Sequence, residues 1–100
     1  MAKKFENNVN EKNLILTRAQ GAVISRDFPT AARLYKQLLK DDPSNVDYLK
    51  ELGAIYRRLK RYEESIEILE RATDEGRQSA DVNYNLGFTY REMGNWDDAI

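Results

Sequence analysis

The chain has 100 residues, of which 41% are hydrophobic and 33% charged, and its formal net charge is −1. This composition fits one small soluble helical domain and does not fit a disordered tail. Because the chain has no cysteine and no histidine, disulfides, thiolate nucleophiles, histidine bases and the usual zinc ligand sets are excluded. Lysine and arginine are spread along a chain that is not basic overall, so we expect no nucleic-acid partner.

The composition of two segments excludes further classes. The lysines at the start of the chain have no apolar segment behind them, so they do not form a secretory signal. The most apolar run, Leu14 to Ile24, is too short to span a bilayer. The lack of cysteine is compatible with a reducing compartment. We therefore expect a cytoplasmic protein with no membrane partner.

The chain opens with a polar stretch, residues 1–11, which we interpret as a frayed lead-in or a polar first turn. Apolar residues at three- and four-residue spacing then predict a first helix. Asp27 is expected to cap a second helix, which tolerates Pro29 in its first turn. Asp41-Asp42-Pro43 is expected to end the second helix, and Ser44–Asp47 is a weak capping box for the third. Turns are expected at Lys60-Arg61 and at Gly94-Asn95. Gly76 is expected to end the fourth helix and Ser79 to cap the fifth. These signals predict five complete helices and the start of a sixth at Trp96.

One stretch of the sequence recurs 34 residues later. Leu49–Tyr56 returns as Asn83–Tyr90, and a fixed period of this length indicates stacked units rather than one closed globule. Three identities keep the register: Leu52 with Leu86, Gly53 with Gly87 and Tyr56 with Tyr90.

The motif Leu-x-x-Leu-Gly-x-x-Tyr, followed by Ser65-x-x-x-Leu69, resembles the tetratricopeptide repeat. The resemblance covers residues 12–100 and divides them into units 12–45, 46–79 and 80–100, the last incomplete. It implies an all-α, right-handed superhelical stack of antiparallel helix pairs with about two and a half repeats. We also expect the chain to be the N-terminal part of a longer repeat protein, whose unfinished edge offers a route to homo-oligomers.

The repeated residues have physical reasons of their own. Gly53 and Gly87 lie in the middle of helices, where glycine costs about 1 kcal/mol relative to alanine. We therefore expect a close approach of two helices at both positions. Four aromatic residues are expected to fill the spaces between helices: Tyr56, Tyr62, Tyr90 and Trp96. The acidic pairs Glu63-Glu64 and Asp97-Asp98 are each expected to open a second helix, at the positive end of its dipole.

These interpretations leave no candidate catalytic residue, and no metal or other cofactor is expected. The resemblance implies a concave groove, lined by the first helices of the units, that holds an extended or helical peptide. Tyr84 and Phe88 are one helical turn apart on one face, and Asn85 offers an amide beside them. The predicted partner-binding residues are Lys50, Arg57, Tyr84, Asn85, Phe88 and Arg91. The other groove places carried over from the family include Leu16, Gln20 and Val23 in the first unit and Asp47 and Glu51 in the second.

Some members of the family clamp a partner's C-terminal carboxylate with a Lys, Asn, Asn, Lys, Arg set. In this chain those places hold Leu16, Gln20, Glu51, Asp81 and Asn85, so that mode of binding is disfavoured. We therefore predict a non-catalytic module that binds a protein or peptide partner in the groove. The alternative is a structural self-assembly segment of a longer repeat protein.

Overall fold

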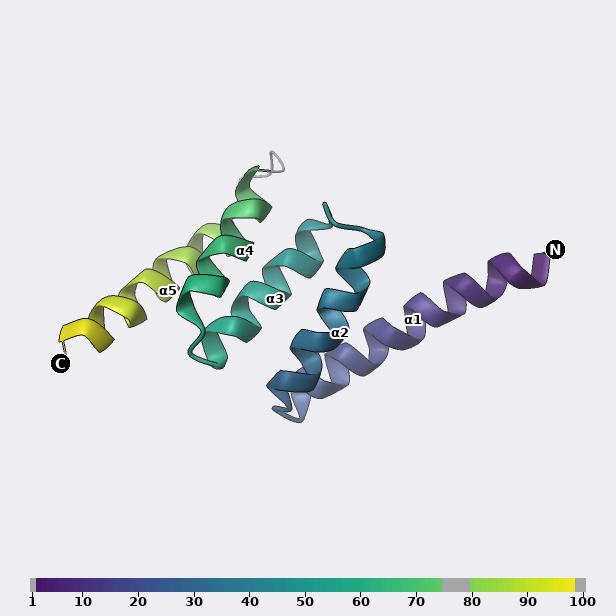
Figure 1. Cartoon of the computed structure of the whole chain (residues 1–100), viewed down its shortest axis with the longest axis horizontal. Helices are drawn as coiled ribbons and strands as arrows, with labels where there is room; N and C mark the ends of the chain where they lie inside the picture. Colours follow the sequence, from purple (N-terminus) through teal and green to yellow (C-terminus); the bar gives the residue numbers. More distant parts are fainter. Residues whose placement is uncertain (1, 75–79, 99–100) are drawn as a thin grey trace.

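A computed structural model of the chain describes the backbone of residues 2–74 and 80–98 and the side chains of residues 11–74 and 80–94. These residues form five α-helices and no strand: α1 Ala2–Ile24, α2 Phe28–Asp41, α3 Val46–Arg58, α4 Tyr62–Asp74 and α5 Ala80–Asp98. Successive helices run in alternating directions along a molecule that measures 58 × 31 × 18 Å (Figure 1). No helix in the described part of the chain is long and apolar enough to cross a membrane.

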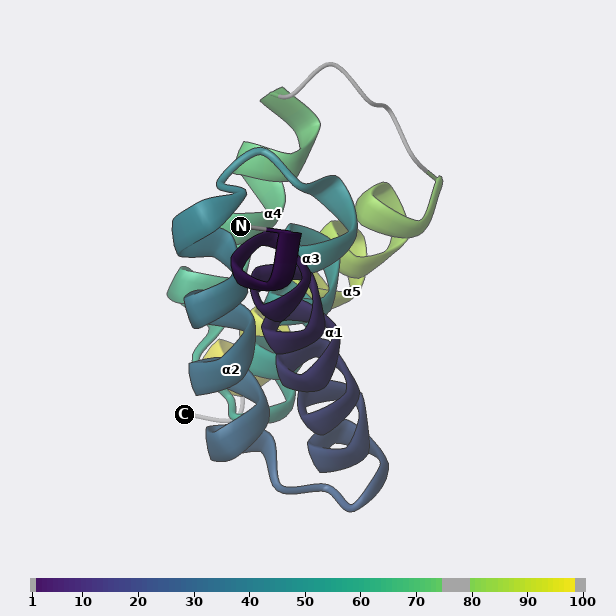
Figure 2. The same cartoon turned by 90° about the vertical axis from the view of Figure 1, so that its right-hand side faces the viewer.

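The helices form two rows. α1, α3 and α5 lie on one side, and α2 and α4 lie on the other (Figure 2). Each helix packs mainly against the next one in the chain, and α3 also contacts α5. Contacts limited to near neighbours are typical of a solenoid. The predicted all-α stack of helix pairs is confirmed.

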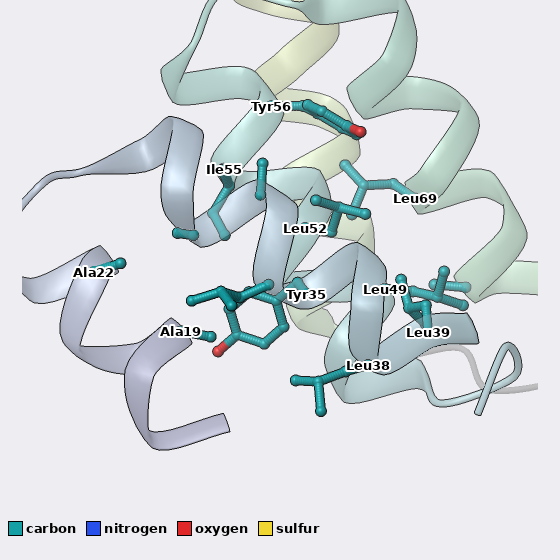
Figure 3. Close-up of a cluster of buried hydrophobic side chains, with 14 of the residues drawn as sticks. Ala19, Ala22, Tyr35, Leu38, Leu39, Leu49, Leu52, Ile55, Tyr56 and Leu69 are labelled. Carbon is teal, nitrogen blue, oxygen red and sulfur yellow. The ribbon is translucent and has the colours of Figure 1, made fainter. Parts of the chain in front are cut away.

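The core is continuous from one pair to the next. Leu49 and Leu52 of α3 and Leu69 of α4 are at most 1% exposed, and burial of such a side chain contributes about 1.5–3 kcal/mol. The described part of α1 contributes two small buried residues to this core, Ala19 and Ala22, and the fully buried Ala19 points toward Tyr35 of α2 (Figure 3). The core therefore joins the helix pairs into one body.

Local signals correctly predicted most helix ends, with one shift. A carboxylate oxygen of Asp27 accepts a hydrogen bond from the Thr30 amide at 3.4 Å and caps α2. At α3 the capping residue is Asn45 and not Ser44, so the predicted capping box is wrong. The Asn45 side-chain oxygen accepts a hydrogen bond from the Tyr48 backbone amide at 3.1 Å, and its side-chain nitrogen donates one to the Asp42 carboxylate at 2.9 Å. This second bond orients the Asn45 amide as the cap.

The two ends of the chain differ from the sequence prediction. α1 begins at Ala2, so residues 2–11 form several turns of helix and not a frayed lead-in or a single turn. α5 runs without a break to Asp98, so the predicted turn at Gly94-Asn95 and the predicted sixth helix are wrong. Asp97-Asp98 accordingly lies at the end of a helix and not at the start of one. The predicted signals at Gly76 and Ser79 lie outside the described residues.

The long α5 departs from the pattern of the first two units. Arg26 and Lys60 have positive φ angles of 64° and 63° and end the first helices of units one and two. Gly94 is the equivalent residue of the third unit. In the first two units the following helix packs back on its partner, and that packing offsets the helical hydrogen bonds lost at the turn. At Gly94 the helical hydrogen bonds continue instead, and α5 runs on to Asp98.

Gly53 and Gly87 differ in whether another described helix packs against them. A Cβ added at Gly53 would lie 2.5 Å from Leu69 Cγ, which confirms the predicted close approach. A Cβ at Gly87 would meet nothing within 4 Å, so the prediction for Gly87 is wrong. Tyr56 is buried as predicted, whereas Tyr90 is 50% exposed and fills no space between helices. Both errors arise because α4 covers α3 and no described helix covers the equivalent side of α5. The side chain of Trp96 lies outside the described residues.

Candidate functional site

The first cluster lies where α5 runs beside α3. The ammonium group of Lys50 on α3 is 3.5 Å from a carboxylate oxygen of Asp81 at the start of α5. About two turns further along α3, Arg57 donates a hydrogen bond to Glu92 at 3.1 Å. These two ion pairs connect α3 and α5 at points about two helical turns apart. We call this surface the α3–α5 face: Lys50, Arg57, Asp81, Tyr84, Phe88 and Glu92.

Arg57 is the central residue of the α3–α5 face. Its guanidinium carbon lies 4.5 Å from the centroid of the Phe88 ring, a cation–π contact that contributes about 0.5–2 kcal/mol. The Phe88 ring lies against Tyr84, with centroids 5.8 Å apart and planes tilted by 44°. The Arg57 side chain is only 15% exposed, and its Nε is buried with no hydrogen-bond partner among the described residues. Arg57 therefore holds Phe88 and Glu92 in place rather than reaching into solvent.

Glu92 extends this network to a third helix. Burial, and then the negative charge of Glu92, raise the pKa of the Tyr62 hydroxyl on α4. Glu92 thus lies between Arg57 of α3 and Tyr62 of α4. Glu92 was not among the residues predicted from the sequence to form this site. Its signal was available, because Arg57 and Glu92 occupy neighbouring register positions in successive units and carry opposite charges.

The structure brings four of the six predicted binding residues together. Lys50, Arg57, Tyr84 and Phe88 all belong to the α3–α5 face, and Tyr84 is 68% exposed there. Asn85 is half-buried beside them, and its backbone carbonyl accepts a hydrogen bond from the Thr89 hydroxyl at 2.8 Å. Arg91 is exposed on α5 and has no ion pair or cation–π contact with the other five in the described part of the chain.

A hollow of about 560 Å³ lies between α1 and α3, next to the α3–α5 face. Its lining mixes apolar, amide and acidic side chains, with Lys50 shared between the two surfaces: Leu16, Gln20, Val23, Ile24, Tyr35, Asn45, Asp47, Tyr48, Lys50 and Glu51. Six of these occupy places that the family resemblance assigned to the groove, although only Lys50 was among the predicted binding residues. The missed signal was the register itself, which applies to the first unit as well as to the later ones.

Two tyrosines form part of the wall of this hollow. The rings of Tyr35 and Tyr48 are 6.2 Å apart at an angle of 54°. Burial, followed by the negative charge of Glu51 and the neighbouring Tyr48, raises the pKa of Tyr35 to about 12. Among the described residues, no group of three or more acidic side chains is placed to hold a metal ion.

Paired antiparallel helices in a fixed register, with their first helices in one row, define an α-solenoid of helical repeats. The chain belongs to the tetratricopeptide repeat family: one family model described as a tetratricopeptide repeat matches residues 16–80, and another with the same description matches residues 81–100. The chain is also similar to a solved structure described as the crystal structure of MamA protein, with a TM-score of 0.75 and 29% sequence identity. That match covers 82% of this chain and 45% of the other, so the chain spans less than half of the MamA chain. Tetratricopeptide repeats generally mediate protein–protein interactions, and the family points to a non-catalytic repeat protein.

Proposed function

We propose that the chain is a cytoplasmic, non-catalytic module that binds a peptide segment of a partner protein along α1, α3 and α5. The observation that carries this proposal is the state of Tyr84. Its ring is 68% exposed, yet it is held against Phe88, which Arg57 holds in turn. An exposed aromatic ring that is already ordered loses little conformational entropy on binding. Aromatic residues of this kind often contribute most of the binding energy of an interface.

The other predicted residues have distinct roles in this proposal. The amide of Asn85 pairs with the backbone of the bound peptide, and Arg91 meets its carboxylates. Lys50 joins the hollow to the α3–α5 face and exchanges Asp81 for a peptide carboxylate. This exchange is inexpensive, because the Asp81 side chain is 73% exposed and an exposed ion pair contributes only about 0–1 kcal/mol. Arg57 supports binding indirectly, by holding Phe88.

The test is to select binders from a random peptide library and to measure their affinity for single variants. Tyr84→Ala should weaken binding by about tenfold or more, as expected for a central aromatic contact. Tyr90→Ala is the matched control, because Tyr90 is also half exposed on α5 but lies about 120° around the helix from Tyr84. Equal effects of the two variants, or amide NMR shifts confined to residues outside α1, α3 and α5, would contradict the proposal.

One observation favours a second candidate function, self-assembly. The side of α5 that carries Gly87 and Tyr90 is exposed, and a second copy packed on it would bury this surface. Sedimentation at two well-separated concentrations distinguishes the two functions. A self-assembly segment associates as its concentration rises, and Tyr90→Ala weakens that association. A peptide-binding module stays at one mass, and Tyr84→Ala is then the variant that alters its interactions.

A further inference from the structure

A second hollow lies on the side of α2, away from the surfaces described above. Its volume is about 790 Å³. It lies between α2 and the connection from α3 to α4, and it is lined by Pro29, Ala32, Arg33, Lys36, Gln37, Lys40, Asp41, Tyr56, Leu59 and Arg61. This volume lies within the range of about 300–1,000 Å³ that is typical of ligand sites. None of the predicted binding residues lines it.

The lining of this α2 hollow contains four cationic side chains and one carboxylate, although the net charge of the whole chain is −1. Arg33, Lys36 and Lys40 follow one another at spacings of three and four residues, so they share one stripe of α2. All three are exposed, and none has an ion pair with any residue that the structure describes. Like charges at this spacing repel one another by a few tenths of a kcal/mol per pair. A ligand of opposite charge would remove that repulsion.

Arg61 differs from the other three cations because it is already paired. Its guanidinium group donates two hydrogen bonds to the Glu64 carboxylate, at 2.6 and 2.8 Å, and lies 5.2 Å from the centroid of the Tyr56 ring. Arg61 is thereby fixed as one wall of the hollow. The attraction for an anion comes from the stripe on α2.

The remaining lining residues indicate that the ligand carries an apolar group as well as negative charge. Pro29, Leu59 and the buried residues Ala32 and Tyr56 give the hollow an apolar lining. A nucleic-acid backbone presents phosphates and sugars and would leave these apolar groups without a partner. An acidic peptide matches both the cationic stripe and the apolar lining, because its carboxylates reach Arg33, Lys36 and Lys40 while an apolar side chain enters the hollow.

We propose that the α2 hollow is a second binding site, which takes an acidic peptide segment with an apolar side chain between its carboxylates. The site is distinct from the α3–α5 face, because its cationic stripe lies on α2 and it shares no lining residue with that face. The chain would thus contact two different segments at once.

The probe for this site is a short fluorescein-labelled peptide of alternating glutamate and leucine, titrated with the whole chain and followed by fluorescence anisotropy. The double variant Lys36→Gln, Lys40→Gln should weaken binding by about tenfold or more, since it removes two charge contacts. The matched control is Lys12→Gln, Arg18→Gln, which has the same net charge but alters exposed cations of α1. We expect that control, and also Tyr84→Ala, to bind the probe as the unaltered chain does. Melting curves of each variant establish that it is folded.

Two further probes test the identity of the ligand. A peptide with glutamine in place of glutamate should lose most of the binding, and an all-glutamate peptide should bind more weakly than the alternating one. Equal effects of the two double variants would overturn the site. Tighter binding of a duplex DNA oligonucleotide through Lys36 and Lys40 would overturn the acidic-peptide assignment. Loss of binding with Tyr84→Ala alone would show that the probe occupies the α3–α5 face instead.

Discussion

Gly53 and Gly87 occupy the same position in successive repeats, and the structure predicts opposite effects when each is replaced by alanine. At Gly53 a new Cβ would lie 2.5 Å from Leu69 Cγ and from Leu69 Cδ2, whereas carbon atoms at optimal contact are about 3.5–4.0 Å apart. Leu69 is fully buried, and a side chain in a close-packed core moves only by displacing its neighbours. Relief of this overlap costs about 1–3 kcal/mol, and alanine's higher helix propensity offsets about 1 kcal/mol of that cost. Gly53→Ala should therefore destabilise the protein by about 1 kcal/mol, and by at most about 2 kcal/mol.

At Gly87 the gain in helix propensity is not opposed by any steric overlap. A Cβ there would have no neighbour within 4 Å, so Gly87→Ala should stabilise α5 by about 0.5–1 kcal/mol through helix propensity alone. Urea unfolding followed by circular dichroism measures the overall free energy of unfolding. Amide hydrogen exchange then resolves α3 from α5, which matters because repeats can unfold separately. For a domain of this size, 1 kcal/mol corresponds to a shift of about 4–8 °C in Tm.

A third variant isolates the cause. Leu69→Ala removes the atoms that a Cβ at Gly53 would meet, at a cost of about 2–5 kcal/mol. In that background Gly53→Ala should become neutral or stabilising. A steric clash with Leu69 would be refuted if Gly53→Ala raised Tm as much as Gly87→Ala does, or if its effect were the same with and without the Leu69 side chain.

The remaining predictions concern two buried polar groups. The Ser65 hydroxyl donates a hydrogen bond to the carbonyl of Gly53 at 2.7 Å inside the core, so Ser65→Ala should lower the free energy of unfolding in urea by about 1–2 kcal/mol. The control Ser44→Ala, at an exposed turn, should change it by less than about 0.5 kcal/mol. Equal losses in the two variants would contradict this prediction. Tyr35 has its pKa raised from 10.0 to about 12, so between these pH values the unfolded chain releases the tyrosine proton while the folded chain keeps it. Stability should therefore fall by about 2 kcal/mol over that range, and Tyr35→Phe should remove this part of the pH dependence; an unchanged slope in the variant would contradict the assignment.

The sequence alone determined the repeat, its register and most helix ends. The 34-residue recurrence of Leu52, Gly53 and Tyr56 is visible without coordinates, and a period of that length predicts stacked helix pairs. Asp27 and Lys60-Arg61 act through bonds and torsions within a few residues of themselves, so they too were predictable. The predicted α3 cap was one residue away from the observed one, because a hydrogen bond from the Asn45 side chain to Asp42 favours Asn45 over Ser44 as the cap.

The tertiary structure decided which of the repeated residues are buried and which charges are paired. Gly53 and Gly87 have the same register, but α4 packs on one and no described helix packs on the other. Arg57 was predicted as a cation available to a ligand, but the neighbouring helix places Glu92 and Phe88 against it. Arg33, Lys36 and Lys40 share one stripe of α2 by their spacing alone, but the hollow beside them forms only because the end of α3 lies against α2. The reason is that each helix of a solenoid is completed by its neighbours, so the environment of a residue depends on a helix encoded elsewhere in the chain.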